Sequence, residues 1–417
     1  MKNQGFLSIV FALLAFSCGS ATDEIRIQVT NPLDQDRPDA IILLSRSAIS
    51  NWTDIPEGEW PLLREGKGVP IPSQLIDVDG DGTWDQLFAL THMEASGQKI
   101  VNLSFVPPDE YPEFEKRTNL RLGDATKSDY PELQEAVRLE GITYHNHGST
   151  KEFYQMEGPA WENDKVGFRN YLDQRSGMDI FGKLTSEMVL DGVGLPGTSS
   201  YHEPAAWGMD VLKVGTSLGS GAIGYLYKDS IYRVGDNGSG TYRVAFEGTQ
   251  LSRFYLSHAD WKVEDLSLDV NHQIDIAAGR HYFQAKVTYT GTDETLPLVT
   301  GIVNINSDSL HVMELDNNHM GLFTHAPQAE DTSLLTMALI IPKDYILSYG
   351  ATKDEGEGVT QTYYVVLDAQ AGEAVPYRFY SLWEKEDPRW KSMEEVQTFL
   401  QGEAERWSQS LMFEVIP

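Results

Sequence analysis

Most of the chain alternates between apolar and polar positions with a period of two. Short β-branched and aromatic runs recur from residue 25 onward, among them IRIQVTN, AIILLS, TYRVAFEGT, SLDVNHQIDIAA and HYFQAKVTYTG. Pro, Gly and Asp residues separate the runs, as is typical of strands joined by tight turns. This pattern predicts an all-β protein made of antiparallel sandwiches.

The runs fall into two groups. We expect residues 23–108 to form a small N-terminal β-sandwich and residues 133–417 a large antiparallel β-sandwich. Residues 109–132 are polar and contain prolines, which predicts a linker between the two.

One segment near the C-terminus has a helical period instead. In SMEEVQTFLQGEAERW, Ser392 and Glu395 form a capping box, and Met393, Val396, Leu400 and Trp407 lie near one face. We expect this helix to pack on the large sandwich.

The N-terminus predicts export. Residues 1–17 contain an apolar run too short to span a bilayer, and a small residue precedes Cys18. We interpret this as a lipoprotein signal peptide with Cys18 as the acylated residue. A plain secretory signal is the alternative. No other cysteine follows, so disulfides and thiolate chemistry are excluded from the mature chain. We expect a lipid-anchored protein in the periplasm or at the outer membrane.

The formal net charge of −30 argues against a nucleic-acid partner, because phosphate binding requires a basic surface. Clusters of basic residues are therefore more informative here than in a neutral protein. No second apolar stretch is long enough to cross a membrane, so contact with the bilayer is expected only through the lipid.

The stretch DVDGDGTWD places four carboxylates around a glycine turn: Asp77, Asp79, Asp81 and Asp85. Alternating carboxylates can converge on a hard cation, so this turn is a candidate structural calcium site. The alternative is an acidic hairpin turn, since Asp-Gly is itself a turn signal. No cofactor is expected for catalysis.

Three further stretches carry candidate chemistry. In YHNHGST, His145 and His147 lie on one face of a strand, where two imidazoles can bind a metal or share acid–base work. The alternative is a pair of ordinary histidines. In WENDKVGFRNYLDQR, guanidinium groups accompany a phenol and a carboxylate, an arrangement that suits an anionic ligand or, alternatively, a structural Arg–Asp ion pair. Its candidate residues are Lys165, Arg169, Tyr171 and Arg175.

The third stretch, YHEPAAWGMD, combines Tyr201, His202 and Trp207. An indole on which a sugar ring stacks, next to an imidazole and a phenol that reach its hydroxyls, is typical of a carbohydrate pocket.

Two of these blocks, EGPAWENDKVGFRNYLDQRSGMDIFGK and YHEPAAWGMDVLKVGTSLGSGAIG, resemble a Bacteroidota family catalogued as a domain of unknown function, which includes ulvan oligosaccharide dehydratases. The resemblance runs from about residue 139 to 407. It implies a galactose-mutarotase-like β-supersandwich and an acidic oligosaccharide substrate. The implied reaction removes water from a non-reducing-end uronic acid and leaves a 4,5-unsaturated uronyl residue.

Such a β-elimination needs a group that neutralises the substrate carboxylate, a base for the C5 proton and an acid for the C4 hydroxyl. We expect Arg169 or Arg175 to neutralise the carboxylate. The base and acid are expected among His145, His147, His202, Tyr171 and Tyr201, with Lys165 and Trp207 in substrate binding. A polysaccharide lyase, a mutarotase or epimerase, and a non-catalytic glycan-binding lipoprotein remain alternatives. The sequence leaves the oligomeric state open.

Overall fold

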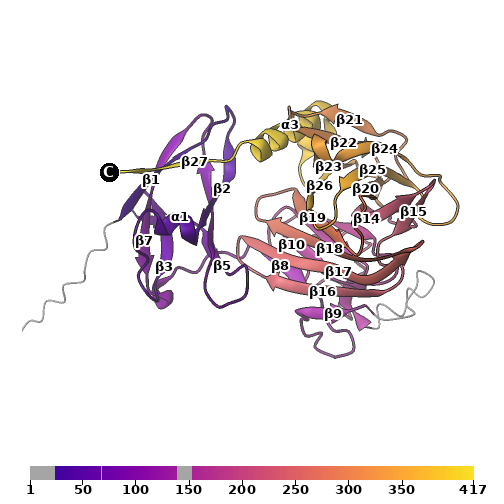
Figure 1. The fold of residues 1–417 in the computed structure, drawn as a ribbon, viewed down its shortest axis with the longest axis horizontal. Helices are drawn as coiled ribbons and strands as arrows, with labels where there is room; N and C mark the ends of the chain where they lie inside the picture. Colours follow the sequence, from indigo (N-terminus) through magenta and orange to yellow (C-terminus); the bar gives the residue numbers. More distant parts are fainter. Residues whose placement is uncertain (1–23, 67, 139–152) are drawn as a thin grey trace, which may run out of the picture.

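The computed structural model describes residues 24–66, 68–138 and 153–417. The N-terminal part is a sandwich of two antiparallel sheets, ordered β27-β1-β7-β3-β4 and β2-β6-β5 (Figure 1). Its strands are β1 (Ile25–Thr30), β2 (Arg37–Ser45), β3 (Trp60–Glu65), β4 (Val69–Pro70), β5 (Ser73–Ile76), β6 (Gln86–Met93), β7 (Gln98–Val106) and β27 (Met412–Ile416). A short helix, α1 (Arg46–Ser50), follows β2 and is capped by the Ser45 hydroxyl.

The core of this sandwich is formed by the apolar residues that alternate with polar ones along each strand. Ile27 and Val29 of β1 and Ile42 and Leu44 of β2 point inward and are buried, while the residues between them are more exposed. One face of each strand therefore supplies the apolar contact that holds the two sheets together.

The large domain is a second and bigger sandwich. One layer is a long sheet ordered β21-β22-β23-β26-β19-β18-β17-β16-β9. Its strands are β9 (Glu135–Val137), β16 (Ser239–Phe246), β17 (Leu251–Val263), β18 (Leu266–Ala277), β19 (Tyr282–Thr290), β21 (His311–Glu314), β22 (His319–Ala326), β23 (Leu335–Pro342) and β26 (Val375–Trp383).

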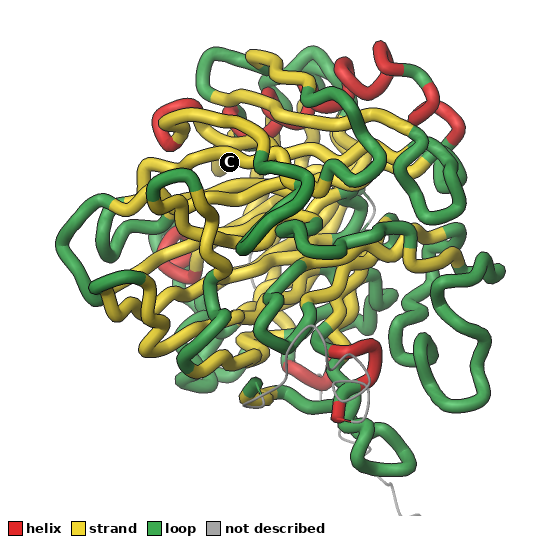
Figure 2. The backbone as a smooth tube through the Cα atoms, turned by 90° about the vertical axis from the view of Figure 1, so that its right-hand side faces the viewer, coloured by secondary structure: helices red, strands yellow, loops and turns green. Residues whose placement is uncertain are grey.

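Two smaller sheets face this layer, ordered β13-β12-β11-β10-β8 and β15-β14-β20-β25-β24. They consist of β8 (Thr118–Arg121), β10 (Ala160–Asn163), β11 (Val166–Asn170), β12 (Met178–Lys183), β13 (Gly208–Asp210), β14 (Ser220–Tyr227), β15 (Ser230–Arg233), β20 (Leu296–Val303), β24 (Ile346–Ala351) and β25 (Thr362–Ala369). Trp161, Phe168, Phe283 and Phe379 pack ring against ring in the shared core. Figure 2 shows the strands filling the interior and the loops running around them.

The C-terminal helix α3 (Met393–Ser408) covers the outer face of the long sheet. Val396 and Leu400 are fully buried there, against Ala338 and Ile340 of β23. The Ser392 hydroxyl accepts a hydrogen bond from the Glu395 amide at 3.3 Å. The predicted helix and its cap are thus present, and the all-β sandwich fold class is confirmed.

The structure differs from the predicted division of the chain in two places. Residues 118–121, inside the expected linker, form strand β8, which is fully buried and pairs with β10. Residues 412–416, assigned to the large domain, form β27 and pair with β1 of the N-terminal sandwich (Figure 1). Both strands are short and their partners are distant along the chain, so local alternation gives no sign of either pairing.

Among the described residues, no helix is long and apolar enough to cross a membrane. Cys18 lies outside the described residues, and so do His145 and His147.

Candidate functional site

The candidate site is built on the sheet that contains β11, β12 and β13. Arg169 on β11 lies directly opposite Asp179 on β12. Asp210 ends β13 and lies opposite Phe181, two residues further along β12 and on the same face as Asp179. Three neighbouring strands therefore bring one guanidinium and two carboxylates to the same spot.

Arg169 is fully enclosed and its terminal nitrogens are occupied. Nη2 donates to the carboxylate of Asp179, to Asp210 Oδ2 at 3.0 Å and to the Tyr171 hydroxyl at 2.7 Å. Nη1 donates to the Met156 carbonyl at 3.1 Å and to the Tyr201 hydroxyl at 3.2 Å. With 1% of its surface exposed, this guanidinium binds groups of the protein itself.

The electrostatics of this cluster follow from burial. Burial opposes the charge of Arg169, but the Tyr171 phenol and the two carboxylates raise its pKa above the ordinary value. Burial and the nearby Asp179 raise the pKa of Asp210 well above its usual range. One guanidinium faces two carboxylates, so the three groups carry a negative charge that Arg169 does not balance and that favours a positive charge beside Asp210.

His202 connects this buried cluster to the surface. Its Nδ1 lies 3.3 Å from Asp210 Oδ2, and 53% of its side chain is exposed while Asp210 is buried. A carboxylate at Nδ1 orients an imidazole and selects the tautomer whose Nε2 accepts a proton. The Tyr201 ring packs beside it, with ring centroids 4.4 Å apart. A histidine held by a buried acid at the surface has the geometry of a general base.

A second arginine, Arg175, contacts the Tyr171 ring. The guanidinium carbon of Arg175 lies 3.7 Å from the centre of the Tyr171 ring, which is a cation–π contact. Arg175 also pairs with Asp173 at 2.6 Å and with Glu157 at 3.1 Å. The Tyr171 hydroxyl in turn donates to Asp179 at 2.6 Å, so this phenol is fixed at both ends.

The backbone next to the cluster is strained. Met156 and Glu157 have φ values of 55° and 68°, and Gly158 follows at 154°. A Cβ on Gly158 would lie 2.2 Å from the Asn170 carbonyl. Non-glycine residues at positive φ cost free energy and are concentrated at functional sites. Here they direct the Met156 carbonyl to Arg169 and the Glu157 carboxylate to Arg175.

The segment from residue 184 to 207 covers this face of the sheet and carries Tyr201 and His202. Glu162 Oε1 accepts the amides of Val189 and Leu190 at 2.7 and 2.8 Å. The Gln155 side chain donates to three carbonyls of the same segment, and Glu162 also pairs with Lys183. Buried polar anchors thus hold the segment against the sheet.

The structure brings some of the predicted site residues together and places others elsewhere. Arg169, Tyr171, Tyr201 and His202 come together, and Arg175 adjoins them. Trp207 packs on Phe181 at the base of the covering segment. Lys165 does not join them: it directly precedes β11, roughly 13 Å from Arg169 along the strand direction, with Glu386 3.8 Å from its Nζ.

The structure corrects one predicted role. We expected Arg169 to bind a substrate carboxylate, but its burial and its bonds to Asp179 and Asp210 match the alternative, a structural ion pair. The local sequence could not separate the two, because the partner carboxylates lie 10 and 41 residues away.

Sequence reasoning missed Asp179 and Asp210 as a pair. A usable signal exists: Gly-Met-Asp occurs at 177–179 and again at 208–210, each time followed by an apolar residue. An acid within an apolar strand is seldom buried unless it is paired, so two such acids indicate a shared partner.

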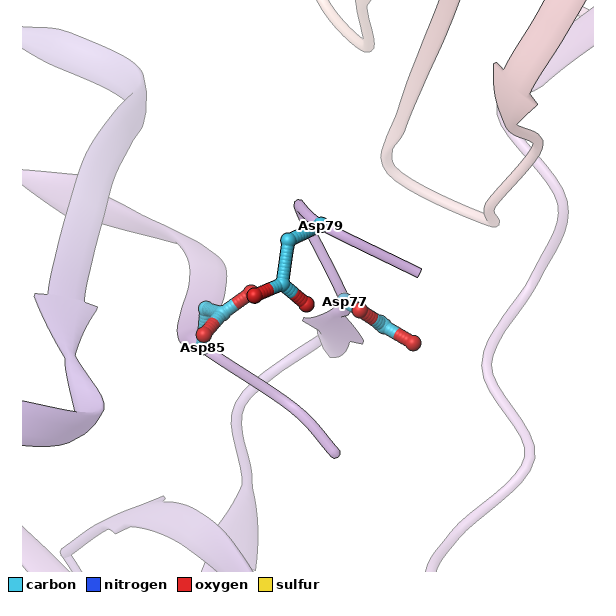
Figure 3. A group of neighbouring side chains, drawn as sticks. All are labelled: Asp77, Asp79 and Asp85. Carbon is cyan, nitrogen blue, oxygen red and sulfur yellow. The ribbon is translucent and has the colours of Figure 1, made fainter. Parts of the chain in front are cut away.

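The acidic turn of the N-terminal sandwich brings together three of its four predicted carboxylates. Asp77, Asp79 and Asp85 place one oxygen each within 4.8 Å of one another (Figure 3). Asp81 lies apart and accepts the Thr83 amide at 2.7 Å. The amides of Gly82 and Gly80 bond to Asp77 and lower its pKa. Three oxygen donors suit calcium, but the same contacts also satisfy a simple turn.

Sequence comparison relates this chain to a protein family and to a curated relative. A family model described as "Domain of unknown function (DUF4861)" matches residues 29–412. Uncharacterized protein P7 of Formosa agariphila is 25% identical over 304 residues, which are 69% of this chain and 69% of that protein.

Two solved structures overlap with 94% of the chain at 7% identity. They are an alpha-mannosidase from Enterococcus faecalis V583, with a TM-score of 0.49, and a glycosyl hydrolase family 38 protein from Enterococcus faecalis, with a TM-score of 0.45. The matched regions make up 46% and 47% of those chains, less than half of their length.

Proposed function

The chain belongs to the DUF4861 domain family, and from this premise we propose that it is a dehydratase of acidic oligosaccharides. The proposed reaction removes water from a non-reducing-end uronic acid of an ulvan-type oligosaccharide and leaves a 4,5-unsaturated uronyl end. The observation that supports it best is the exposed His202 imidazole, 3.3 Å from the buried carboxylate of Asp210. The resemblance of the two long motif blocks supports the substrate class.

In the proposed step, Nε2 of His202 removes the C5 proton of the uronic acid. The electron pair of the C5–H bond forms the C4=C5 double bond, the C4–O bond breaks, and the leaving hydroxide takes a proton from an acid and departs as water. Asp210 stabilises the imidazolium that forms, because its Oδ2 lies 3.3 Å from Nδ1.

We assign the acid to Tyr201 in preference to Tyr171. The Tyr201 ring lies beside His202, and its hydroxyl accepts a hydrogen bond from Arg169. The Tyr171 hydroxyl already donates to Asp179 within a closed network. Arg169 is then a positioning residue. His145 and His147 stay predicted contributors, and Arg175 and Trp207 stay predicted substrate-binding residues.

The direct test uses uronic-acid oligosaccharides of ulvan, with ultraviolet absorbance of the unsaturated uronyl group and product mass as readouts. The wild type should form a product lighter by one water, without chain cleavage. His202→Ala should reduce turnover by about 100-fold or more while oligosaccharide binding persists, since a general base contributes that much. The matched control is His92→Ala, an exposed histidine on β6 of the N-terminal sandwich.

The outcomes separate the alternatives. Two fragments from one chain would identify a polysaccharide lyase, and binding without any product would identify a glycan-binding protein. Full activity in His202→Ala would show that His202 is not the base, even if the wild type removes water from the substrate.

A further inference from the structure

A cavity of about 330 Å³ lies between the two sandwiches, on the side where α3 leads into β27. Figure 1 shows that β27 returns from the end of α3 to the N-terminal sandwich, so this junction joins both domains. Among the described residues that line the cavity, four are arginines and one is a glutamate: Arg37, Arg280, Arg378, Arg406 and Glu403. In a chain with net charge −30, such a concentration of cations needs a reason.

The arginines come from different elements of both domains. Arg37 begins β2 and is 6% exposed, Arg280 precedes β19, Arg378 lies on β26 and Arg406 on α3. Burial and the neighbouring Arg406 and Arg280 lower the pKa of Arg37 to about 10. These cations are therefore close enough to repel one another in a partly desolvated space.

The carboxylates nearby do not neutralise the group. Glu403 Oε1 pairs with Arg406 at 2.6 Å, and its Oε2 accepts from the Tyr380 hydroxyl at 3.3 Å. Asp39 contributes only its backbone carbonyl to Arg280, because its carboxylate binds Arg117 on the other side. One carboxylate thus faces four guanidinium groups.

Three nitrogen atoms of the arginines that line the cavity have no hydrogen-bond partner among the described residues. They are the Nε atoms of Arg37, Arg280 and Arg406, and all three are buried. Backbone carbonyls of Gln409, Asp39 and Asp36 hold the other ends of these side chains in place. Arg378 is held by aromatic rings, 4.1 Å above Trp407 and 4.6 Å from the ring of Tyr282.

We propose that this cavity is an anion-binding site for a tetrahedral oxyanion, a sulfate or phosphate group, clamped between the two domains by Arg37, Arg280, Arg378 and Arg406. Guanidinium groups form strong, charge-assisted hydrogen bonds to such oxygens. A tetrahedral group offers acceptors in several directions at once, which suits donors from β2, β26 and α3 better than a planar carboxylate does. The group is either a free ion or an ester carried by a sugar.

Isothermal titration calorimetry near neutral pH and at low salt tests the site on the purified full chain. Calorimetry is preferable to a melting curve, because sulfate stabilises many proteins without a specific site. The probes are inorganic sulfate, inorganic phosphate, glucose 6-sulfate and, as a blank, glucose. Saturable binding of at least one oxyanion is expected, and tighter binding of glucose 6-sulfate than of inorganic sulfate would identify a sugar ester as the ligand.

The variants locate the binding. Arg37→Met and Arg280→Met should each weaken it by about tenfold or more, the effect of losing one charge-assisted hydrogen bond. Arg243→Met, which removes an exposed arginine from β16, is the control for net charge and should bind as the wild type does.

Glu403→Gln removes the opposing carboxylate and should tighten binding, a gain that misfolding cannot imitate. Absence of saturable binding at millimolar anion, or equal binding in Arg37→Met and Arg243→Met, would overturn the proposal.

Discussion

Arg169 is enclosed by its own network, and this determines what its replacement should do. In Arg169→Met the carboxylates of Asp179 and Asp210 would lose their shared cation inside the protein. Breaking a buried pair in this way costs about 3–5 kcal/mol of unfolding free energy. Urea denaturation should show this loss, whereas Arg243→Met at the surface should change little.

A second substitution separates a structural role from direct substrate binding. Asp210→Asn added to Arg169→Met removes one unpaired charge and should restore part of the stability. If Arg169→Met folds with wild-type stability and loses only substrate affinity, the guanidinium binds substrate after all.

Two histidines of the long sheet, His258 on β17 and His272 on β18, should make the protein sensitive to acid. Burial lowers the pKa of His258 and of His272 to about 3, with Arg138 contributing at His258 and His258 at His272. The unfolded chain binds protons near pH 6.5 and the folded protein does not. The contribution of these two histidines to the unfolding free energy is therefore fully present above about pH 6.5 and is lost as the pH decreases toward 3.

His272→Gln tests this dependence. The amide can keep the contact that His272 Nε2 makes with the Tyr377 hydroxyl at 2.8 Å, but it does not titrate. Between pH 6 and 4, the slope of unfolding free energy against pH should decrease by up to about 1.4 kcal/mol per pH unit relative to wild type. Equal slopes for the two proteins in urea titrations would contradict a neutral buried His272.

The strand β13 depends on one glycine to place Asp210. Gly208 has φ of 132°, and a Cβ there would lie 1.8 Å from the Gly182 carbonyl of β12. Gly208→Ala should lower the unfolding free energy by about 2–4 kcal/mol through clash and strain.

Gly197→Ala is the matched control, because Gly197, in the neighbouring covering segment, has φ of 84° but no atom within 4 Å of the added Cβ. Its cost should be only about 1 kcal/mol. Similar losses in both variants, measured by urea denaturation, would show that the close approach of β12 and β13 does not determine the effect.

The acidic turn between β5 and β6 is the second element with a defined test. If Asp77, Asp79 and Asp85 hold calcium, a chelator should lower the melting temperature, because an ion bound only to the folded state stabilises it. Asp79→Asn should abolish this response. A wild-type melting curve that does not change in chelator leaves an acidic turn without an ion.

For the molecule as a whole, the N-terminal signal predicts where it resides. We propose that Cys18 carries the lipid that anchors the protein in the periplasm or at the outer membrane. Cys18→Ala should then accumulate in the soluble periplasmic fraction or remain unprocessed, as measured by membrane fractionation and immunoblotting. Partition with membranes at the wild-type level would mean that a plain secretory signal or another contact is responsible.

Features that depend on neighbours along the chain could be predicted from the sequence. A period of two in apolar residues predicts strands, and a period near 3.6 with a serine cap predicts α3, because each follows from the geometry of a few consecutive residues. The convergence of Asp77, Asp79, Asp81 and Asp85 is predicted for the same reason, since a glycine turn brings alternate side chains together, and the structure brings three of the four together.

Which side chains share a site depends on how distant strands pack together. Arg169 meets Asp210 from 41 residues away, and β27 meets β1 across nearly the whole chain. Arg37 and Arg406 reach one cavity from opposite ends of the sequence. A charged residue in a strand has the same local pattern whether it faces water or a buried partner. Strand order and register determine whether the residue faces water or a partner. They are set by the burial of apolar faces over the whole molecule.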